Sequence, residues 1–245
     1  MSVTLTVLGC GDAFSAGGRR HTSFLLRTEN RLLLLDCGAN TLAALKERNL
    51  SGNDIDVLLV SHFHGDHMAG VPFLLLDAAR LKREKPLHIF SPAGGKNIFR
   101  QLVGLFYPGM EELVHTLPIQ WHAYSEGKIL QAADLELQAW PVLHTPESKP
   151  HALRFSIAGK TIAFSGDTAW TPLLYEVAAF ADLFICECTF FKKKDENHIS
   201  FVTLETHRAG FTCRRLLLSH FDEEMLANGA QIAEEMAVDG LELTI

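Results

Sequence analysis

The stretch His62-Phe63-His64-Gly65-Asp66-His67 places three imidazoles and one carboxylate within six residues. Zinc in proteins is commonly bound by imidazole nitrogens and carboxylate oxygens. An apolar, β-branched run at residues 55–61 precedes the motif and predicts a buried strand. Apolar residues at helical spacing follow it, from residue 68 to 81, and predict a helix. The motif therefore belongs on the turn that leaves the C-terminal end of a strand, where α/β folds place their ligands.

The motif is the signature of the metallo-β-lactamase superfamily, and the chain resembles that superfamily along its whole length. Four further segments carry the resemblance, and in each a polar residue ends an apolar, strand-like run. These residues are Asp36, His144, Asp167 in a Gly-Asp-Thr turn, and His220. Strand ends at one edge of a sheet lie close in space although they are distant in sequence. The residue pattern therefore agrees with the resemblance.

The resemblance implies seven metal ligands, which are too many for one tetrahedral zinc, so two metals are expected. His62, His64 and His144 would hold the first metal. Asp66, His67 and His220 would hold the second, and Asp167 would bridge them. Asp36 would buttress the metal loop. We expect two Zn²⁺, with Mn²⁺ or Fe as alternatives, and hydrolysis through a metal-bound hydroxide.

Strands and helices are predicted to alternate along the chain. Strands are expected near residues 4–8, 22–27, 32–36, 57–61, 87–90, 135–142, 152–157, 161–165, 183–188 and 214–219. Helices are expected at 41–48, 68–81, 95–106, 172–180, 200–210 and 222–238. This order favours two packed sheets with helices outside, a four-layer αββα sandwich of the α/β class. The resemblance implies the same metallo-β-lactamase fold.

Size and composition are typical of one domain spanning residues 1–245, because 245 residues at 47% hydrophobic content can bury a large core. No apolar run reaches 18 residues, so no membrane span is expected. The N-terminal residues lack the features of a signal peptide, and five scattered cysteines favour a reducing compartment. We therefore expect a cytoplasmic protein, and a homodimer is compatible with these features.

The C-terminal third resembles one branch of the superfamily, that of ribonuclease Z and related phosphodiesterases. Residues 185–190 are followed by His198-Ile199-Ser200 and then by the strand that ends at His220. The resemblance implies that Glu187 and His198 form a pair beside the metals. A carboxylate that accepts a hydrogen bond from imidazole raises its pKa, so the imidazolium can protonate a leaving oxygen. Asp66, Glu187 and His198 are thus the expected catalytic residues.

Two departures from ribonuclease Z bear on the substrate. After Asp36-Cys37 the chain continues with Gly38-Ala39-Asn40-Thr41, and residues between His67 and His144 show no Gly- and Pro-rich arm that would grip transfer RNA. The net charge of −7 also argues against a broad nucleic-acid footprint. A small phosphodiester, such as a cyclic nucleotide or cyclic phosphate, is the expected substrate, and nucleic acid is not favoured. Arg19, Arg20, His21 and the triplet Lys192-Lys193-Lys194 are candidates for phosphate contact.

Three other functions remain open. A tRNA 3′-processing endonuclease would need a basic groove or arm. A carbonyl-centred hydrolase, such as a lactonase or thioesterase, would have no need of a Glu187–His198 acid. A non-catalytic binding protein on the same fold would show lost ligands, and none is lost in this sequence.

Overall fold

Each of the two sheets in the computed structural model, which describes residues 2–245, has seven strands. The order in the first sheet is β14 (Glu242–Thr244), β1 (Thr4–Gly9), β2 (Ser23–Arg27), β3 (Leu32–Leu35), β4 (Val57–Leu59), β5 (Leu87–Ser91) and β6 (Ile119–Ala123). The order in the second is β13 (Glu235–Met236), β12 (Leu216–Ser219), β11 (Leu183–Glu187), β10 (Lys160–Phe164), β9 (His151–Ile157), β8 (Leu135–Pro141) and β7 (Leu130–Ala132).

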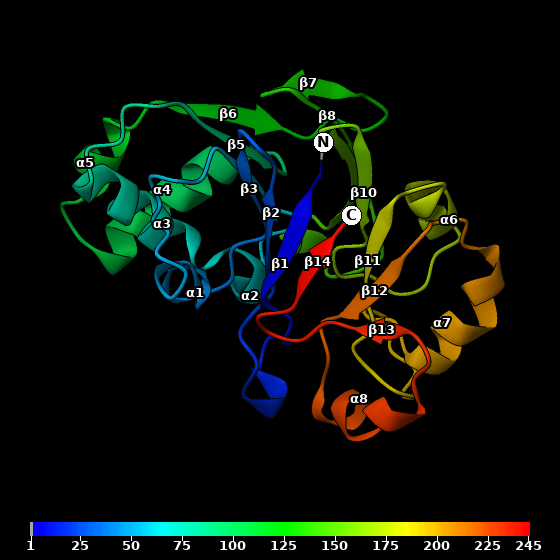
Figure 1. Ribbon diagram of the computed structural model, residues 1–245. Helices are drawn as coiled ribbons and strands as arrows, with labels where there is room; N and C mark the ends of the chain where they lie inside the picture. Colours follow the sequence, from blue (N-terminus) through cyan, green and yellow to red (C-terminus); the bar gives the residue numbers. More distant parts are fainter. Residues whose placement is uncertain (1) are drawn as a thin grey trace.

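Helices cover the outer faces of both sheets (Figure 1). Those on the side of the first sheet are α1 (Thr41–Lys46), α3 (Val71–Arg80), α4 (Gly95–Phe106) and α5 (Glu111–His115), and the short α2 (Gly65–Met68) precedes α3. Those on the other side are α6 (Leu173–Ala178), α7 (Phe201–His207) and α8 (Glu223–Ala227). The predicted αββα layering is confirmed.

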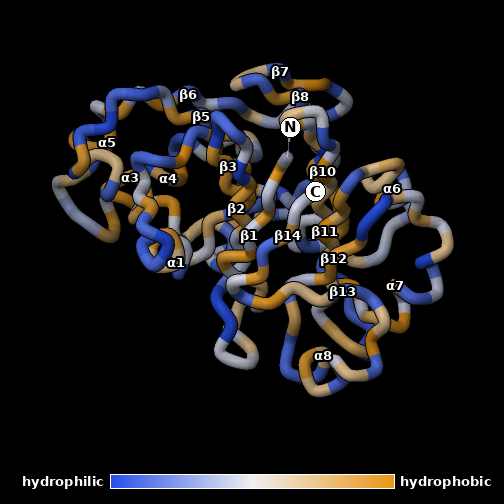
Figure 2. The backbone as a smooth tube through the Cα atoms, viewed as in Figure 1, coloured by the Kyte–Doolittle hydropathy of each residue, from blue (hydrophilic) through white to orange (hydrophobic). Residues whose placement is uncertain are grey.

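The strands of the first sheet are continuous apolar runs because both faces of this sheet are buried. Alternate residues of one strand serve two cores, because side chains point to opposite faces. Leu33 and Leu35 enter the core between the sheets, whereas Leu34 packs beneath α1, α3 and α4. Phe24 and Phe164 meet across the sheets, with ring centroids 5.9 Å apart. Figure 2 shows hydrophobic residues concentrated along the central strands of both sheets.

Several predicted boundaries changed. The helix expected at residues 222–238 is wrong: α8 ends at Ala227, a 3₁₀ turn spans Gly229–Gln231, and β13 pairs in parallel with β12. Asn228 and Gly229 interrupt the helix, and pairing with β12 then determines the conformation of residues 235–236. The sequence did not predict the strands that form the edges of the two sheets, which are β6, β7, β13 and β14. None of the helices between residues 2 and 245 combines the length and apolar character needed to cross a membrane.

Candidate metal centre

The seven predicted ligands come from four segments that follow strand ends, and the structure brings them together. His62 and His64 lie between β4 and α2, while Asp66 and His67 lie within α2 rather than on a plain turn. His144 follows β8, Asp167 follows β10 and His220 follows β12. The chain turns sharply after β12, where His220 adopts a φ of 64°. Strands from both sheets therefore deliver donors to one edge of the sandwich.

The donor atoms form two groups that share one residue. His62, His64, His144 and Asp167 make the first group, and Asp66, His67, His220 and Asp167 make the second. Within each group all donor atoms lie within 4.8 Å of one another. Asp167 Oδ2 lies 3.7 Å from His62 Nε2, 3.2 Å from His67 Nε2 and 3.3 Å from His220 Nε2. One carboxylate oxygen thus stands between the two groups.

The spacing and the donor types fit divalent metal such as zinc. Donors about 2.1 Å from one tetrahedral zinc are roughly 3.4 Å apart. His144 Nε2 lies 3.0 Å from His64 Nδ1, and Asp66 Oδ2 lies 3.3 Å from His67 Nε2 and 3.1 Å from His220 Nε2. Among residues 2–245, the buried atoms His62 Nε2 and His67 Nε2 have no hydrogen-bond partner. Buried nitrogens without partners are expected where a cation completes their coordination.

Hydrogen bonds behind four of the five rings hold these imidazoles with Nε2 facing the centre, whereas His64 presents Nδ1. His67 Nδ1 donates to Asp36 Oδ2 at 2.7 Å, and His144 Nδ1 donates to the Asn197 carbonyl at 2.9 Å. The Ser61 hydroxyl donates to Asp36, so its oxygen accepts from His62 Nδ1 at 2.9 Å. By the same logic, the Thr189 hydroxyl donates to Glu187 and accepts from His220 Nδ1 at 2.9 Å. Such partners fix the tautomer and orientation of a metal-binding histidine.

Asp36 supports the metal loop as the resemblance implied. It is fully buried and adopts a φ of 57° after β3. Its two oxygens accept hydrogen bonds from the Ser61 backbone and hydroxyl groups and from His67. Burial raises the pKa of this carboxyl, while His67 opposes that shift.

The electrostatics of the second group favour a cation. Burial lowers the pKa of His67, but Asp167, Asp66 and Asp36 outweigh it and hold this pKa well above its usual range. Burial raises the pKa of Asp66, but His67 and His220 outweigh it and hold it below its usual value. Three buried carboxylates around one imidazole need positive charge in the centre, which either a proton or a metal ion supplies.

Glu187 and His198 form the predicted pair beside both groups. His198 Nδ1 lies 3.0 Å from Glu187 Oε1, and Glu187 also accepts from the Thr168 and Ile199 backbone N–H groups. The His198 ring stacks on that of His220, with centroids 5.3 Å apart, and meets His144 edge-on at 4.9 Å. Burial lowers the pKa of His198, but Glu187 outweighs it and raises this pKa to about 9. Metal cations bound nearby would lower it again, because like charges repel.

The basic residues that were predicted to contact phosphate differ in the partners that they have within the protein. Arg19 Nη1 donates to the Ala237 carbonyl at 2.7 Å, and Arg20 pairs with Glu47 at 2.8 Å. Both arginines are therefore engaged within the protein. His21 packs against Gly38, where an added Cβ would lie 2.4 Å from the His21 Cβ and 2.5 Å from the Asp66 carbonyl oxygen. Lys193 is held by Asp195 at 3.0 Å.

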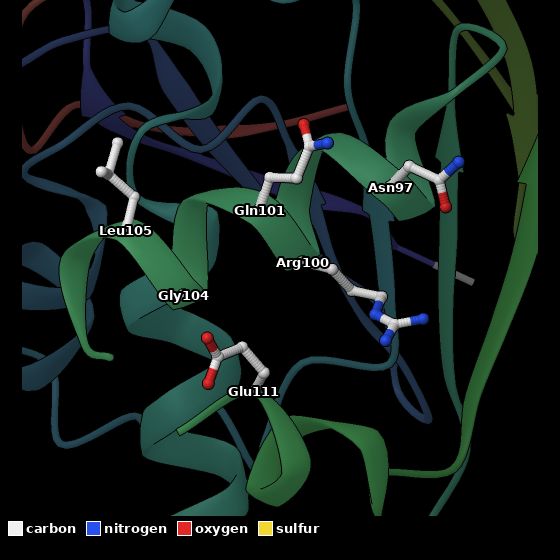
Figure 3. A pocket seen from close by; sticks show the side chains of 6 residues that line it. All are labelled: Asn97, Arg100, Gln101, Gly104, Leu105 and Glu111. Carbon is white, nitrogen blue, oxygen red and sulfur yellow. The ribbon is translucent and has the colours of Figure 1, made fainter. Parts of the chain in front are cut away.

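A wide surface hollow lies away from these residues. It measures 590 Å³ and is lined from α4 and α5 by Asn97, Arg100, Gln101, Gly104, Leu105 and Glu111, as Figure 3 shows. None of the candidate ligands borders it. This hollow is therefore separate from the candidate metal centre.

Sequence reasoning missed the residues that orient the imidazoles: Ser61, Thr189 and Asn197. Each is adjacent or close in sequence to a predicted site residue, since Ser61 precedes His62, Thr189 follows Glu187 by two positions and Asn197 precedes His198. This closeness in sequence is the one signal that the chain offers for them, and it does not say which imidazole each residue would contact.

Comparisons with known proteins show what the chain is similar to. A family model described as "Anti-Pycsar protein Apyc1" matches residues 3–238. Ribonuclease Z of Clostridium acetobutylicum is 26% identical over 289 aligned positions, which cover 94% of this chain and 93% of that relative.

Two solved structures have similar folds. The metallo-β-lactamase fold protein YhfI from Bacillus subtilis superposes with a TM-score of 0.79 at 21% identity, over 100% of both chains. The short form of human tRNase Z, ELAC1, gives a TM-score of 0.79 at 20% identity over 98% of each chain. The metallo-β-lactamase fold that the sequence predicted is thereby confirmed.

Proposed function

The chain belongs to the family of the anti-Pycsar protein Apyc1, within the ribonuclease Z-like branch of the metallo-β-lactamase superfamily, and we propose that it hydrolyses small phosphodiesters at a two-zinc centre. It is a metal-dependent phosphoric diester hydrolase.

The pairing of Glu187 with His198 beside two donor groups carries the proposal. When bound, the metals would polarise the phosphoryl oxygens and lower the pKa of water to about 7. Glu187 holds His198 through Nδ1, so Nε2 is the nitrogen that can donate a proton to the leaving oxygen. Asp66 contacts His67 and His220 through Oδ2, which leaves Oδ1 to accept a proton from the attacking water.

A phosphodiester uses more of this site than a carbonyl substrate does. Two bound metals would neutralise the charge of its two non-bridging oxygens, and His198 can supply the proton that its alkoxide leaving group needs. A lactone or thioester needs one metal to polarise one carbonyl. A site with two donor groups therefore suits the two non-bridging oxygens of a phosphodiester better than the single carbonyl oxygen of a lactone or thioester.

The size of the substrate is inferred from what the chain lacks. The alignment with the clostridial ribonuclease Z has 289 positions, and this exceeds the 245 residues of the chain by 44. The relative therefore contains at least that many residues with no counterpart in this chain. Together with the net charge of −7, this favours a cyclic nucleotide or cyclic phosphate over a long polyanion.

RNA processing is the second candidate, because relatives that match most of this chain are named ribonuclease Z. A panel of bis(p-nitrophenyl) phosphate, cyclic nucleotides, a lactone and precursor tRNA, with metal content measured on the same samples, tests both. We expect turnover of the small phosphodiesters by protein that holds two zinc ions per chain. His144→Ala is the matched variant and should lose activity together with the first metal. Preferred cleavage of precursor tRNA, or of the lactone, would refute the proposal.

A further inference from the structure

The segment from Phe190 to His198 connects the acid pair with the first ligand group. His144 Nδ1 donates to the carbonyl of Asn197, and the next residue, His198, is held by Glu187. Of these two consecutive residues, Asn197 contacts a proposed metal ligand and His198 is the proposed acid. Any rotation of the backbone at Asn197 would move both.

Asp195 fixes the backbone at this point. Asp195 Oδ1 accepts from the Asn197 backbone N–H at 2.9 Å, which closes a tight turn over residues 195–197. Its other oxygen, Oδ2, lies 3.0 Å from Lys193 Nζ. The Asp195 carboxylate thus joins the two halves of the segment.

Lys193 in turn is anchored to the body of the protein. Its ammonium lies 4.0 Å from the centroid of the Phe190 ring, on which a cation is attracted by the aromatic quadrupole. Phe190 is tied to the start of α7, because its carbonyl accepts from the Phe201 N–H at 2.7 Å. Within residues 2–245, neither Lys192 nor Lys194 forms an ion pair, so the basic triplet contributes one structural cation rather than three equivalent ones.

We propose that Asp195 is a positioning residue that holds the Asn197 carbonyl against His144 and the His198 ring against Glu187. The inference rests on the proposed function, because it gives Asp195 its role through the first metal and the acid. A neutral histidine binds metal through Nε2 when Nδ1 carries the proton. The Asn197 carbonyl imposes that tautomer on His144, and Asp195 keeps the carbonyl in place.

Three variants separate this role from general stabilisation of the loop. Asp195→Ala removes the acceptor, whereas Asp195→Asn keeps an oxygen that can accept from the Asn197 N–H. Glu196→Ala is the matched control, because Glu196 is the exposed neighbour and makes no ion pair among the described residues. Zinc affinity is measured by competition with a chromophoric chelator. The protonated nitrogen of His144 is identified in metal-free protein by long-range ¹H–¹⁵N NMR.

Asp195→Ala should weaken the first zinc about 10-fold, the lower end of the effect of removing a direct partner of a metal ligand, because the Asn197 carbonyl stays in the chain but loses its support. It should also leave His144 in a mixture of tautomers, while the affinity of the second zinc changes little. Asp195→Asn and Glu196→Ala should both match the unaltered protein within about threefold in zinc affinity.

The outcomes distinguish this inference from the proposed function. An unaltered protein that binds no zinc refutes the proposed metal centre. If the unaltered protein binds two zinc ions and Asp195→Ala binds them equally well, the positioning role is refuted while the metal centre stands. A loss in Asp195→Asn as large as in Asp195→Ala would also refute it, because the acceptor oxygen is then not what matters.

Discussion

Among the residues that the structure describes, Asp167 is the one side chain with an oxygen near histidine nitrogens of both donor groups, with Oδ2 within 3.7 Å of His62, His67 and His220. Its removal should therefore affect both metals. We expect Asp167→Ala to lose both zinc ions and His67→Ala to weaken mainly the second, as measured by native mass spectrometry. Equal loss of both metals from the two variants would contradict the assignment of a bridge.

His198 should matter in proportion to the proton that the leaving group needs. We expect His198→Ala to keep its metals and to cleave phosphodiesters of poor leaving groups about 10²–10⁴-fold more slowly, the usual contribution of a general acid. The loss should shrink for p-nitrophenyl esters, whose leaving groups depart without a proton. A loss that is uniform across leaving groups would indicate misplacement of the ring instead.

The candidate ligands and the buttressing Asp36 were predictable from sequence, and the other groups behind the ligands were not. His62, His64 and their neighbours stand in a compact motif, and His144, Asp167 and His220 each end an apolar run. Asn197 acts through its backbone carbonyl, which every residue has, so its identity carries no signal. Ser61 and Thr189 act through hydroxyl groups that are common on surfaces and in turns. Their roles emerge only from distances.

The helix α2 depends on a close approach to the backbone that follows β3. An added Cβ at Gly70, just after α2, would lie 2.2 Å from the Gly38 carbonyl oxygen and 2.8 Å from that of Cys37. Gly70→Ala should push α2 away, destabilise the protein by about 1–3 kcal/mol and weaken the second zinc, whose proposed ligands Asp66 and His67 lie in α2. Chemical denaturation and zinc competition measure the two effects.

Gly65, the first residue of α2, provides the control. A Cβ there would meet nothing within 4 Å, so Gly65→Ala should be neutral or stabilise by up to about 1 kcal/mol. If Gly70→Ala proved as stable as Gly65→Ala, the contact of α2 with residues 37 and 38 would not be what positions the motif.

Long, strongly apolar elements were predicted well and edge elements poorly. The helix expected at 95–106 is α4, and the strand expected at 32–36 is β3 with one residue fewer. By contrast, β6 and β7 have largely exposed or half-buried side chains, so their hydrophobic pattern is weak. β13 and β14 have two and three residues, too few for a period of two to be visible.

The charge of the whole molecule bears on the substrate. A net charge of −7 opposes a polyanion, and binding of nucleic acid relies on clustered Lys and Arg that release counterions. We expect the kcat/KM for a small phosphodiester to change little between about 50 and 200 mM salt, and transfer RNA to bind weakly. Submicromolar binding of transfer RNA that falls steeply with salt would instead favour the endonuclease.

The pairing of β1 with β14 brings the described ends of the chain side by side (Figure 1). The Ile245 N–H donates to the Val3 carbonyl at 2.9 Å. The two described ends are thus close enough to be joined. They lie far from the exposed turn at residues 125–128, which connects the edge strands β6 and β7. Joining the ends with a short linker and opening the ring at that turn would preserve every strand neighbour and every donor position. The arrangement of the described elements is therefore a property of their circular order, and the place at which that order is cut is separable from it.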